Sequence, residues 1–115
     1  MTTDTSSATP SEPVSISTQE ELESLISTHD VVLVDFYADW CGPCQMMEPA
    51  IESISEETSA AVVKVDVDRF QQLAADYGVQ GVPTLYLFVD GEPVDRMVGM
   101  QTGDTLETAI ASQAN

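Results

Sequence analysis

Positive charge is scarce in this chain of 115 residues, which has three lysines and arginines in total against 20 aspartates and glutamates. The formal net charge is −17. Nucleic-acid binding depends on basic side chains that neutralise phosphates, so we expect no nucleic-acid partner. Eight acidic residues lie in residues 1–40, seven in residues 41–80 and five in residues 81–115. This even spread indicates an acidic surface rather than an acidic tail.

Long apolar runs are also missing. No stretch approaches the roughly 20 apolar residues of a membrane-spanning helix, so we expect no membrane association. The first 13 residues contain no basic residue and no apolar core, which argues against a secretory signal and favours a cytoplasmic protein. The length suits one domain. Residues 1–12, rich in Ser, Thr and Pro, are expected to form a disordered tail, and residues 13–115 the folded domain.

The excess of negative charge has a physical consequence. A net charge this far from zero makes the compact state repel itself. Molar salt screens that repulsion, because the Debye length falls to about 3 Å at 1 M. The composition therefore predicts a halophilic host with molar intracellular salt. An acidic surface that serves one basic partner is the alternative, but such a patch is usually local and this acidity is not.

Cysteine is limited to Cys41 and Cys44, which follow an apolar strand-like run and open a helix-like segment at residues 45–57. Two thiols three residues apart at a helix start can close a small disulfide. The helix N-terminus stabilises a thiolate, and a thiolate beside a resolving thiol performs thiol–disulfide exchange. Half of a zinc site is the alternative. Zinc takes about four ligands, and His29 is the chain's one histidine, so we expect no metal.

The hydrophobic pattern predicts alternating strands and helices, in the order β-α-β-α-β-α-β-β-α. A capping box at Thr18 and Glu21 begins the first helix, and Pro49 should kink the second. This pattern indicates an α/β fold with a mixed sheet covered by helices on both faces. The expected strands are 14–16, 31–37, 60–67, 84–89 and 93–100. The expected helices run from about 18 to 28, 45 to 57 and 70 to 77, with a terminal helix that starts at Thr102 or Asp104.

Several stretches together resemble the thioredoxin family over roughly residues 14–112. They are Val34–Asp39, Trp-Cys-Gly-Pro-Cys at 40–44, Val63–Asp68, Tyr77–Leu85 with its Val-Pro-Thr, and Val98-Gly99. A bare Cys-x-x-Cys is a weak signal, but this combination is specific. The resemblance implies the thioredoxin fold, with about five strands in a mixed central sheet. It also implies a protein thiol–disulfide oxidoreductase that reduces client disulfides, and Gly-Pro between the cysteines is typical of the reducing members.

The resemblance also implies roles for single residues. Cys41, at what we expect to be an exposed helix N-terminus, would be the nucleophile, and Cys44 would resolve the mixed disulfide. Asp35, inside an apolar strand, should have a raised pKa and accept the proton of Cys44. Lys64, the only lysine, would be the partner of Asp35. A solvent-facing Asp35 and an outward-facing Lys64 are the alternatives.

The substrate groove would be lined by Trp40, Gly42, Pro43, Val82, Pro83 and Gly99. Pro83 resembles the cis-proline of the family, with Val82 offering its backbone to an extended substrate. An ordinary strand-start Pro83 and a Trp40 that fills the core are the alternatives. No cofactor beyond the Cys41–Cys44 disulfide is implied. The expected partners are a thioredoxin reductase and disulfide-containing client proteins, and we expect a monomer.

Three residues depart from the family pattern. Gln45 stands where relatives often have lysine, and Glu48 and Asp39 add negative charge near the cysteines. These departures leave open how far the pKa of Cys41 is lowered. Two other functions also remain open: a binding subunit with incidental thiols, and a specialised enzyme with one client.

Overall fold

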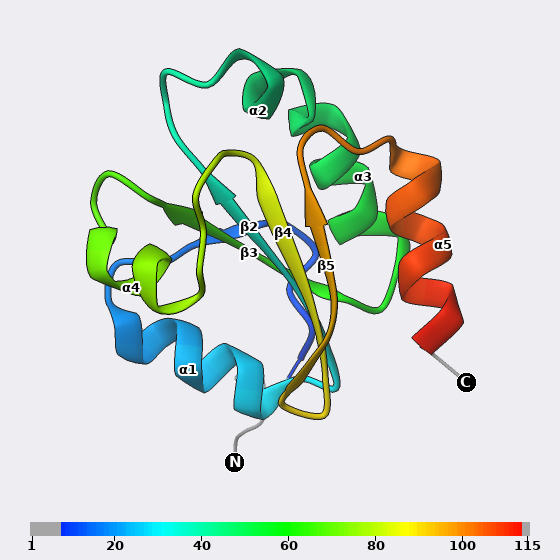
Figure 1. Cartoon of the computed structure of the whole chain (residues 1–115). Coiled ribbons are helices and arrows are strands. Elements are labelled where there is room, and N and C mark those ends of the chain that lie inside the picture. Colours follow the sequence, from blue (N-terminus) through cyan, green and yellow to red (C-terminus); the bar gives the residue numbers. More distant parts are fainter. Residues whose placement is uncertain (1–7, 114–115) are drawn as a thin grey trace.

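A five-stranded mixed sheet forms the centre of the molecule in the computed structural model, which describes residues 8–113 (Figure 1). The strand order is β1-β3-β2-β4-β5. β3 pairs in parallel with β1 and β2, whereas β4 is antiparallel to β2 and β5. The strands are β1 (Val14–Ser15), β2 (Val31–Tyr37), β3 (Ala61–Asp66), β4 (Thr84–Val89) and β5 (Glu92–Val98). The predicted mixed sheet is confirmed.

Helices cover both faces of the sheet, as predicted (Figure 1). α1 and α4 pack on one face, α3 and α5 on the other, and α2 lies beyond one end of the strands. Each face has its own cluster of buried apolar side chains. The helices are α1 (Gln19–Thr28), α2 (Gly42–Met46), α3 (Glu48–Glu57), α4 (Gln71–Asp76) and α5 (Gly103–Gln113).

β2 is the central strand, and its residues 31–36 are all buried. Side chains alternate between the two faces of a strand. Val32, Val34 and Phe36 belong to the cluster under α1 and α4, whereas Val31 and Leu33 belong to the cluster under α3 and α5. The same alternation places Asp35 on the α3 and α5 face. A carboxyl group therefore lies on a face that is otherwise apolar.

The predicted helix at 45–57 differs most from expectation. The structure has two helices there, α2 and α3, with Met47 between them. The predicted kink at Pro49 is thus a one-residue interruption at Met47, and the chain order gains an element. Proline has no amide hydrogen, so Pro49 cannot donate to the carbonyl of residue 45. The helical bonds next to this missing one are kept, because the amide of Met47 donates to the carbonyl of Pro43 and the amide of Ile51 donates to the carbonyl of Met47.

The other boundaries shift by one or two residues. Strands expected at 14–16, 60–67 and 93–100 are Val14–Ser15, Ala61–Asp66 and Glu92–Val98. α5 begins after Thr102, whose Oγ1 accepts a hydrogen bond from the amide of Thr105, so Thr102 is the cap and Asp104 is not.

The capping box is present with one change. Thr18 accepts from the amide of Glu21, but the Glu21 carboxylate accepts from the amide of Ser17 rather than that of Thr18.

The predicted tail lies partly outside the described residues, which begin at residue 8. Residues 8–12 form no helix or strand. Among residues 8–113, every helix is too short or too polar to cross a membrane.

Candidate active site

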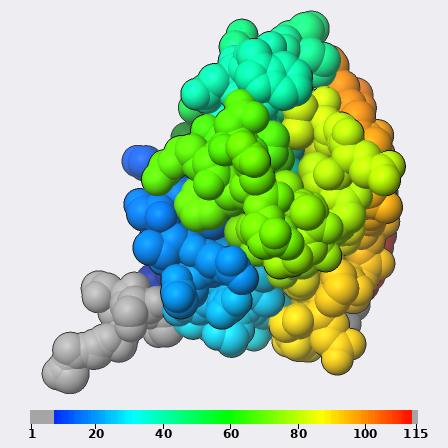
Figure 2. All heavy atoms as spheres, turned by 60° about the vertical axis from the view of Figure 1, so that its left-hand side comes forward, coloured from blue at the N-terminus to red at the C-terminus, as the bar shows by residue number. Residues whose placement is uncertain are grey.

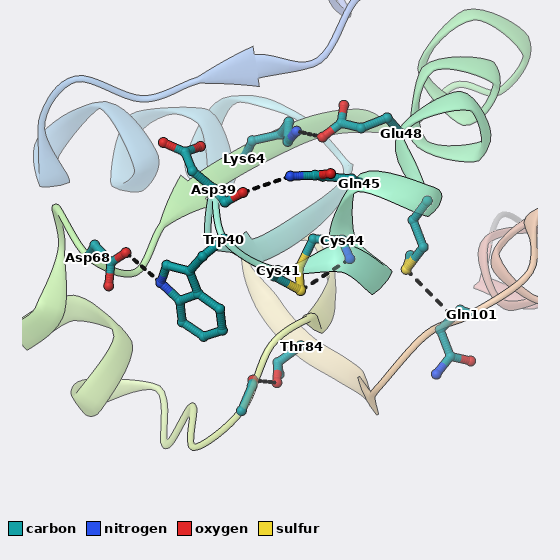
Figure 3. Close-up of a disulfide and its surroundings, with 12 residues drawn as sticks. Asp39, Trp40, Cys41, Cys44, Gln45, Glu48, Lys64, Asp68, Thr84 and Gln101 are labelled. Atoms are coloured by element: carbon teal, nitrogen blue, oxygen red, sulfur yellow. Dashed lines mark hydrogen bonds and ion pairs between the residues drawn. A yellow bond between two sulfur atoms is a disulfide. The ribbon is translucent and has the colours of Figure 1, made fainter.

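The cysteine pair lies just past the end of β2, where the chain turns into α2. Cys41 is the N-cap of α2, and its Sγ accepts a hydrogen bond from the amide of Cys44 at 3.1 Å. Pro43 stands in the first turn, where the missing amide hydrogen of proline costs nothing. The two Cα atoms are 5.2 Å apart, and the sulfur atoms form a disulfide (Figure 3). The structure is therefore that of the oxidised protein.

Both sulfur-bearing residues are buried. Cys41 is 3% exposed and Cys44 4%. The expected exposure of Cys41 is wrong for this oxidised form, because Ala38, Tyr37 and Val82 pack against the pair. Gly42 and Pro43, between the cysteines, are exposed and form the outer surface of the turn.

Trp40 is the most prominent exposed apolar side chain, with 69% of its surface accessible. Its indole N–H donates to the Asp68 carboxylate at 2.9 Å, which fixes the ring beside the disulfide (Figure 3). In Figure 2 the loop around residue 40 lies on top of the chain that leads into α4. A core-filling Trp40 is therefore excluded. A hollow of about 140 Å³ opens beside it, lined by Trp40, Val67, Val79, Gln80, Gly81 and Val82.

Val82 packs against the cysteine pair, and the next residue, Pro83, contacts Gly99. The Val82–Pro83 peptide bond is cis. The amide of Gly99 donates to the carbonyl of Pro83 at 2.8 Å, which ties the end of β5 to the start of β4. Gly99 has φ of +90°, a conformation that L residues rarely adopt, and an added Cβ would contact nothing within 4 Å. Its backbone conformation, rather than crowding inside this chain, therefore requires glycine.

Asp35 lies inside the protein, so a solvent-facing carboxyl is excluded. It is 3% exposed, and its Oδ1 has no hydrogen-bond partner. Burial raises the pKa of Asp35 to about 6, because a low-dielectric interior disfavours the charged form. The positive charge of Lys64 opposes this rise and the negative charge of Glu48 adds to it. A carboxyl with this pKa can gain or lose a proton close to neutral pH.

Lys64 is directly opposite Asp35 in the parallel pairing of β2 and β3. Its side chain is only 11% exposed, and its Nζ lies 4.4 Å from the centre of the Tyr37 ring. It does not face outward. Its ion pair, however, is with Glu48 at the start of α3 (Figure 3). Lys64 thus acts on Asp35 through charge, while its ammonium contacts a different carboxylate.

Two residues at the site have contacts that the sequence did not predict. The sequence shows Glu48 only as an added negative charge, whereas in the structure it forms an ion pair with Lys64, 16 residues away. The sequence shows Gln45 only as a residue in the place of a lysine, whereas in the structure its side-chain amide donates to the carbonyl of Asp39 at 2.8 Å. That bond ties α2 to the loop before Trp40. Neither contact has a signal in a single sequence.

Comparison with known proteins agrees with this geometry. The family model named Thioredoxin matches residues 13–112. The chain belongs to the thioredoxin family. A thioredoxin from Chlamydia caviae is 45% identical over 94 residues, covering 81% of this chain and 91% of that protein. One from Staphylococcus epidermidis is 44% identical over 95 residues, with coverages of 81% and 90%.

Solved thioredoxin structures share the fold. A mutant thioredoxin from Halobacterium salinarum is 56% identical, with a TM-score of 0.91, and the match covers 94% of this chain and 96% of that one. A thioredoxin from Schistosoma mansoni is 34% identical, with a TM-score of 0.82 and coverages of 91% and 98%. Thioredoxins are thiol–disulfide oxidoreductases that act through their own disulfide, and this chain is one of them, with Cys41 and Cys44 as its redox pair.

Proposed function

We propose that this member of the thioredoxin family is a general protein-disulfide reductase. The observation that supports this most directly is the position of Cys41. It caps a helix N-terminus, accepts a hydrogen bond from the amide of Cys44 and lies beside the exposed ring of Trp40. Backbone N–H groups and the helix dipole favour a sulfur anion at that position, which lowers the pKa of a thiol below the usual value of about 8.5.

In the proposed reaction, the Cys41 thiolate attacks one sulfur of a client disulfide. A Cys41–client bond forms, the client S–S bond breaks, and the other client sulfur leaves as a thiolate. The Cys44 thiol then loses its proton and attacks the Cys41 sulfur. The client leaves as a dithiol, and the Cys41–Cys44 disulfide seen here is the product. Two electrons have passed from this protein to the client.

Asp35 is the proposed acceptor of the Cys44 proton. Its pKa of about 6 makes it mostly ionised at pH 7, yet a much stronger base than an ordinary aspartate. Its place on β2, on the face that α3 covers, supports this role. We propose Lys64 as the cation that keeps Asp35 ionised, because Lys64 lowers its pKa.

The proposed client-binding groove is formed by Trp40, Gly42 and Pro43 on one side and by Val82, Pro83 and Gly99 on the other. An extended client segment would pair with the backbone of Val82, which belongs to no strand of the sheet. The electron donor that restores the dithiol would be a thioredoxin reductase. We also propose that the protein acts as a monomer and that residues 13–115 are its thioredoxin domain, which the family match at 13–112 supports.

We further propose a halophilic host and a cytoplasmic location. The net charge of −17 supports the host, as does 56% identity to a thioredoxin from Halobacterium salinarum. Within residues 8–113 one ion pair is present, between Lys64 and Glu48, so most acidic side chains there have no cationic partner.

The test is turnover of insulin disulfides with dithiothreitol as electron donor, measured in 2 M KCl. We expect catalysis by the wild type and none by the double variant Cys41→Ser, Cys44→Ser. A wild type no faster than the double variant would favour a binding subunit with incidental thiols. Activity on one disulfide protein but not on several unrelated ones would favour a dedicated enzyme.

A further inference from the structure

We propose that Glu48 is a positioning residue that holds the ammonium of Lys64 away from Asp35, so that this buried carboxylate keeps no direct cationic partner. The inference deepens the proposed function, because Asp35 is the proton acceptor there. The geometry of three elements, β2, β3 and α3, supports it.

The first step is the register of the sheet. Asp35 on β2 and Lys64 on β3 are paired in the parallel ladder. Neighbours of Asp35 and Lys64, such as Leu33 and Val62, belong to the cluster that α3 covers. The two charged side chains therefore start from adjacent positions on the same face. With nothing else nearby, a lysine in this position would contact the aspartate.

The second step is the position of α3 above that face. α3 begins at Glu48, and the preceding Met47 is fully buried against the same cluster. The helix start thus brings the Glu48 carboxylate to Lys64, and the close-up shows the two side chains pointing toward each other (Figure 3). Asp35 is left with an Oδ1 that has no hydrogen-bond partner. An oxygen without a hydrogen-bond partner on a residue that is 3% exposed costs folding free energy. The ion pair between Glu48 and Lys64 therefore affects a buried group and not only the surface.

The third step is the charge balance. Lys64 from β3 and Glu48 from α3 are the charged groups that act on Asp35, and β4 places the apolar Leu85 opposite it. Tyr37, two residues along β2, has a raised pKa, mainly because of burial. The negative charges of Asp66, Asp39 and Glu48 add to this rise, and the positive charge of Lys64 opposes it. Two carboxylates thus share one ammonium. With both ionised the group has a net charge of −1, and a proton taken up by Asp35 makes it neutral.

A purely structural role for Glu48 is the competing explanation. An acidic residue in the first turn of a helix stabilises it by about 0.3–1 kcal/mol through the helix dipole. That effect changes the melting temperature but not the titration of a separate carboxyl group. The decisive measurement is therefore the pKa of Asp35, not the stability of the protein.

The experiment is a ¹³C NMR titration of the Asp35 carboxyl carbon in the oxidised protein, in which no thiol titrates. We expect the midpoint to lie near 6 in the wild type. In Glu48→Gln it should fall by about 1 unit, because the freed Lys64 can contact Asp35. Glu56→Gln, which removes the same charge two turns along α3, is the matched control and should leave the midpoint unchanged. An unchanged midpoint in Glu48→Gln overturns the proposal.

A double-mutant cycle separates the holding of Lys64 from simple repulsion between carboxylates. Lys64→Met should raise the Asp35 midpoint more in the Glu48→Gln background than in the wild type, because Lys64 contacts Asp35 only when Glu48 is gone. Equal increases in the two backgrounds would mean that Glu48 acts through its own charge alone, which overturns the proposal. Insulin turnover, measured separately, tests the proposed function: loss of turnover in the wild type would leave the titration result intact.

Discussion

At the residue scale, the two cysteines differ in position along α2. Cys41 is the cap, whereas Cys44 is inside the helix and donates its amide to the Cys41 sulfur. Cys44→Ser should therefore accumulate mixed disulfides with client proteins, because attack still occurs but resolution is lost. Cys41→Ser should trap none. Non-reducing electrophoresis after exposure to a disulfide-containing protein measures both, and equal trapping by the two variants would contradict the assignment.

The raised pKa of Asp35 also predicts a pH-dependent stability. Folding raises its pKa from the ordinary 3.8 to about 6, so the native state binds this proton more tightly than the unfolded chain. The contribution of Asp35 to the free energy of unfolding therefore falls as pH rises from about 4 to 6. Above that range the ionised carboxylate is destabilising by about 3 kcal/mol. Asp35→Asn should stabilise the protein by up to this amount at pH 8.

Urea unfolding of both proteins at several pH values, in 2 M KCl, checks the prediction. The difference in unfolding free energy should shrink toward zero near pH 4, where the native Asp35 is protonated. The same variant should reduce insulin disulfides more slowly, because the proposed proton acceptor is gone. A stability difference that does not change with pH, or wild-type turnover across pH 6–9, would contradict the respective role.

The sequence predicted single residues well where a local pattern carries the information. A carboxyl in an apolar strand predicted the burial and raised pKa of Asp35, and a thiol pair at a helix start predicted the disulfide. Contacts between side chains distant in sequence were not predictable. The ion pair between Lys64 and Glu48 depends on how α3 crosses β3, and one sequence contains no record of that crossing.

At the scale of elements, the loop from β5 to α5 contains Gly99, a residue of the proposed groove whose backbone conformation is restricted. Gly99 has φ of +90° and its amide bonds to the carbonyl of Pro83. Gly99→Ala should destabilise the protein by about 1–2 kcal/mol, because a Cβ disfavours this conformation. Gly81→Ala is the matched control. It also has open space for a Cβ but lacks the positive φ, so its urea midpoint should stay near that of the wild type.

Gly99→Ala should also weaken the binding of clients, which a higher KM for insulin would show. If Gly99→Ala kept the wild-type urea midpoint, the backbone strain inferred here would be wrong. If it lost stability but kept the KM for insulin, Gly99 would lie outside the client-binding groove.

Element types were predictable because the apolar patterns are strong, as in the buried run of β2. Boundaries were less so, since the ends of β3 and β5 depend on which neighbour they pair with. Pro49 correctly predicts a disturbance of the helix. The size of this disturbance is not predictable from the sequence, because it depends on how the buried Met47 packs between α2 and α3.

At the scale of the whole molecule, the excess of negative charge determines how stability depends on salt. The chain has a net charge of −17, and residues 8–113 contain a single ion pair, so most acidic side chains there have no cationic partner. Between 0.1 M and 2 M KCl the Debye length falls from about 10 Å to under 3 Å. The unfolded chain is more expanded and gains less from screening, so salt should favour the native state. The melting temperature, followed by circular dichroism, should rise strongly over this range.

A charge-reduced variant controls for effects of salt on apolar burial. Glu52, Glu56 and Glu57 are exposed on α3, and their replacement by glutamine should weaken the salt dependence. A wild-type melting temperature that does not change with salt concentration would favour a surface adapted to a basic partner. The sequence predicted the acidic surface from composition alone, but the host, the partners and the monomeric state remain predictions, since composition does not specify them.

Because Lys64 is buried, the rate at which its amine reacts can report how often the structure around it opens. Lys64 is the only lysine, its side chain is 11% exposed, and its amine is paired with Glu48. Apart from the chain's amino terminus, an amine-directed acylating reagent finds no other target. Acylation of Lys64, read by mass spectrometry, therefore proceeds at a rate set by how often the site opens. The mass shift of the peptide that contains Lys64 would thus report the conformational dynamics of β3 and α3 without any engineered label.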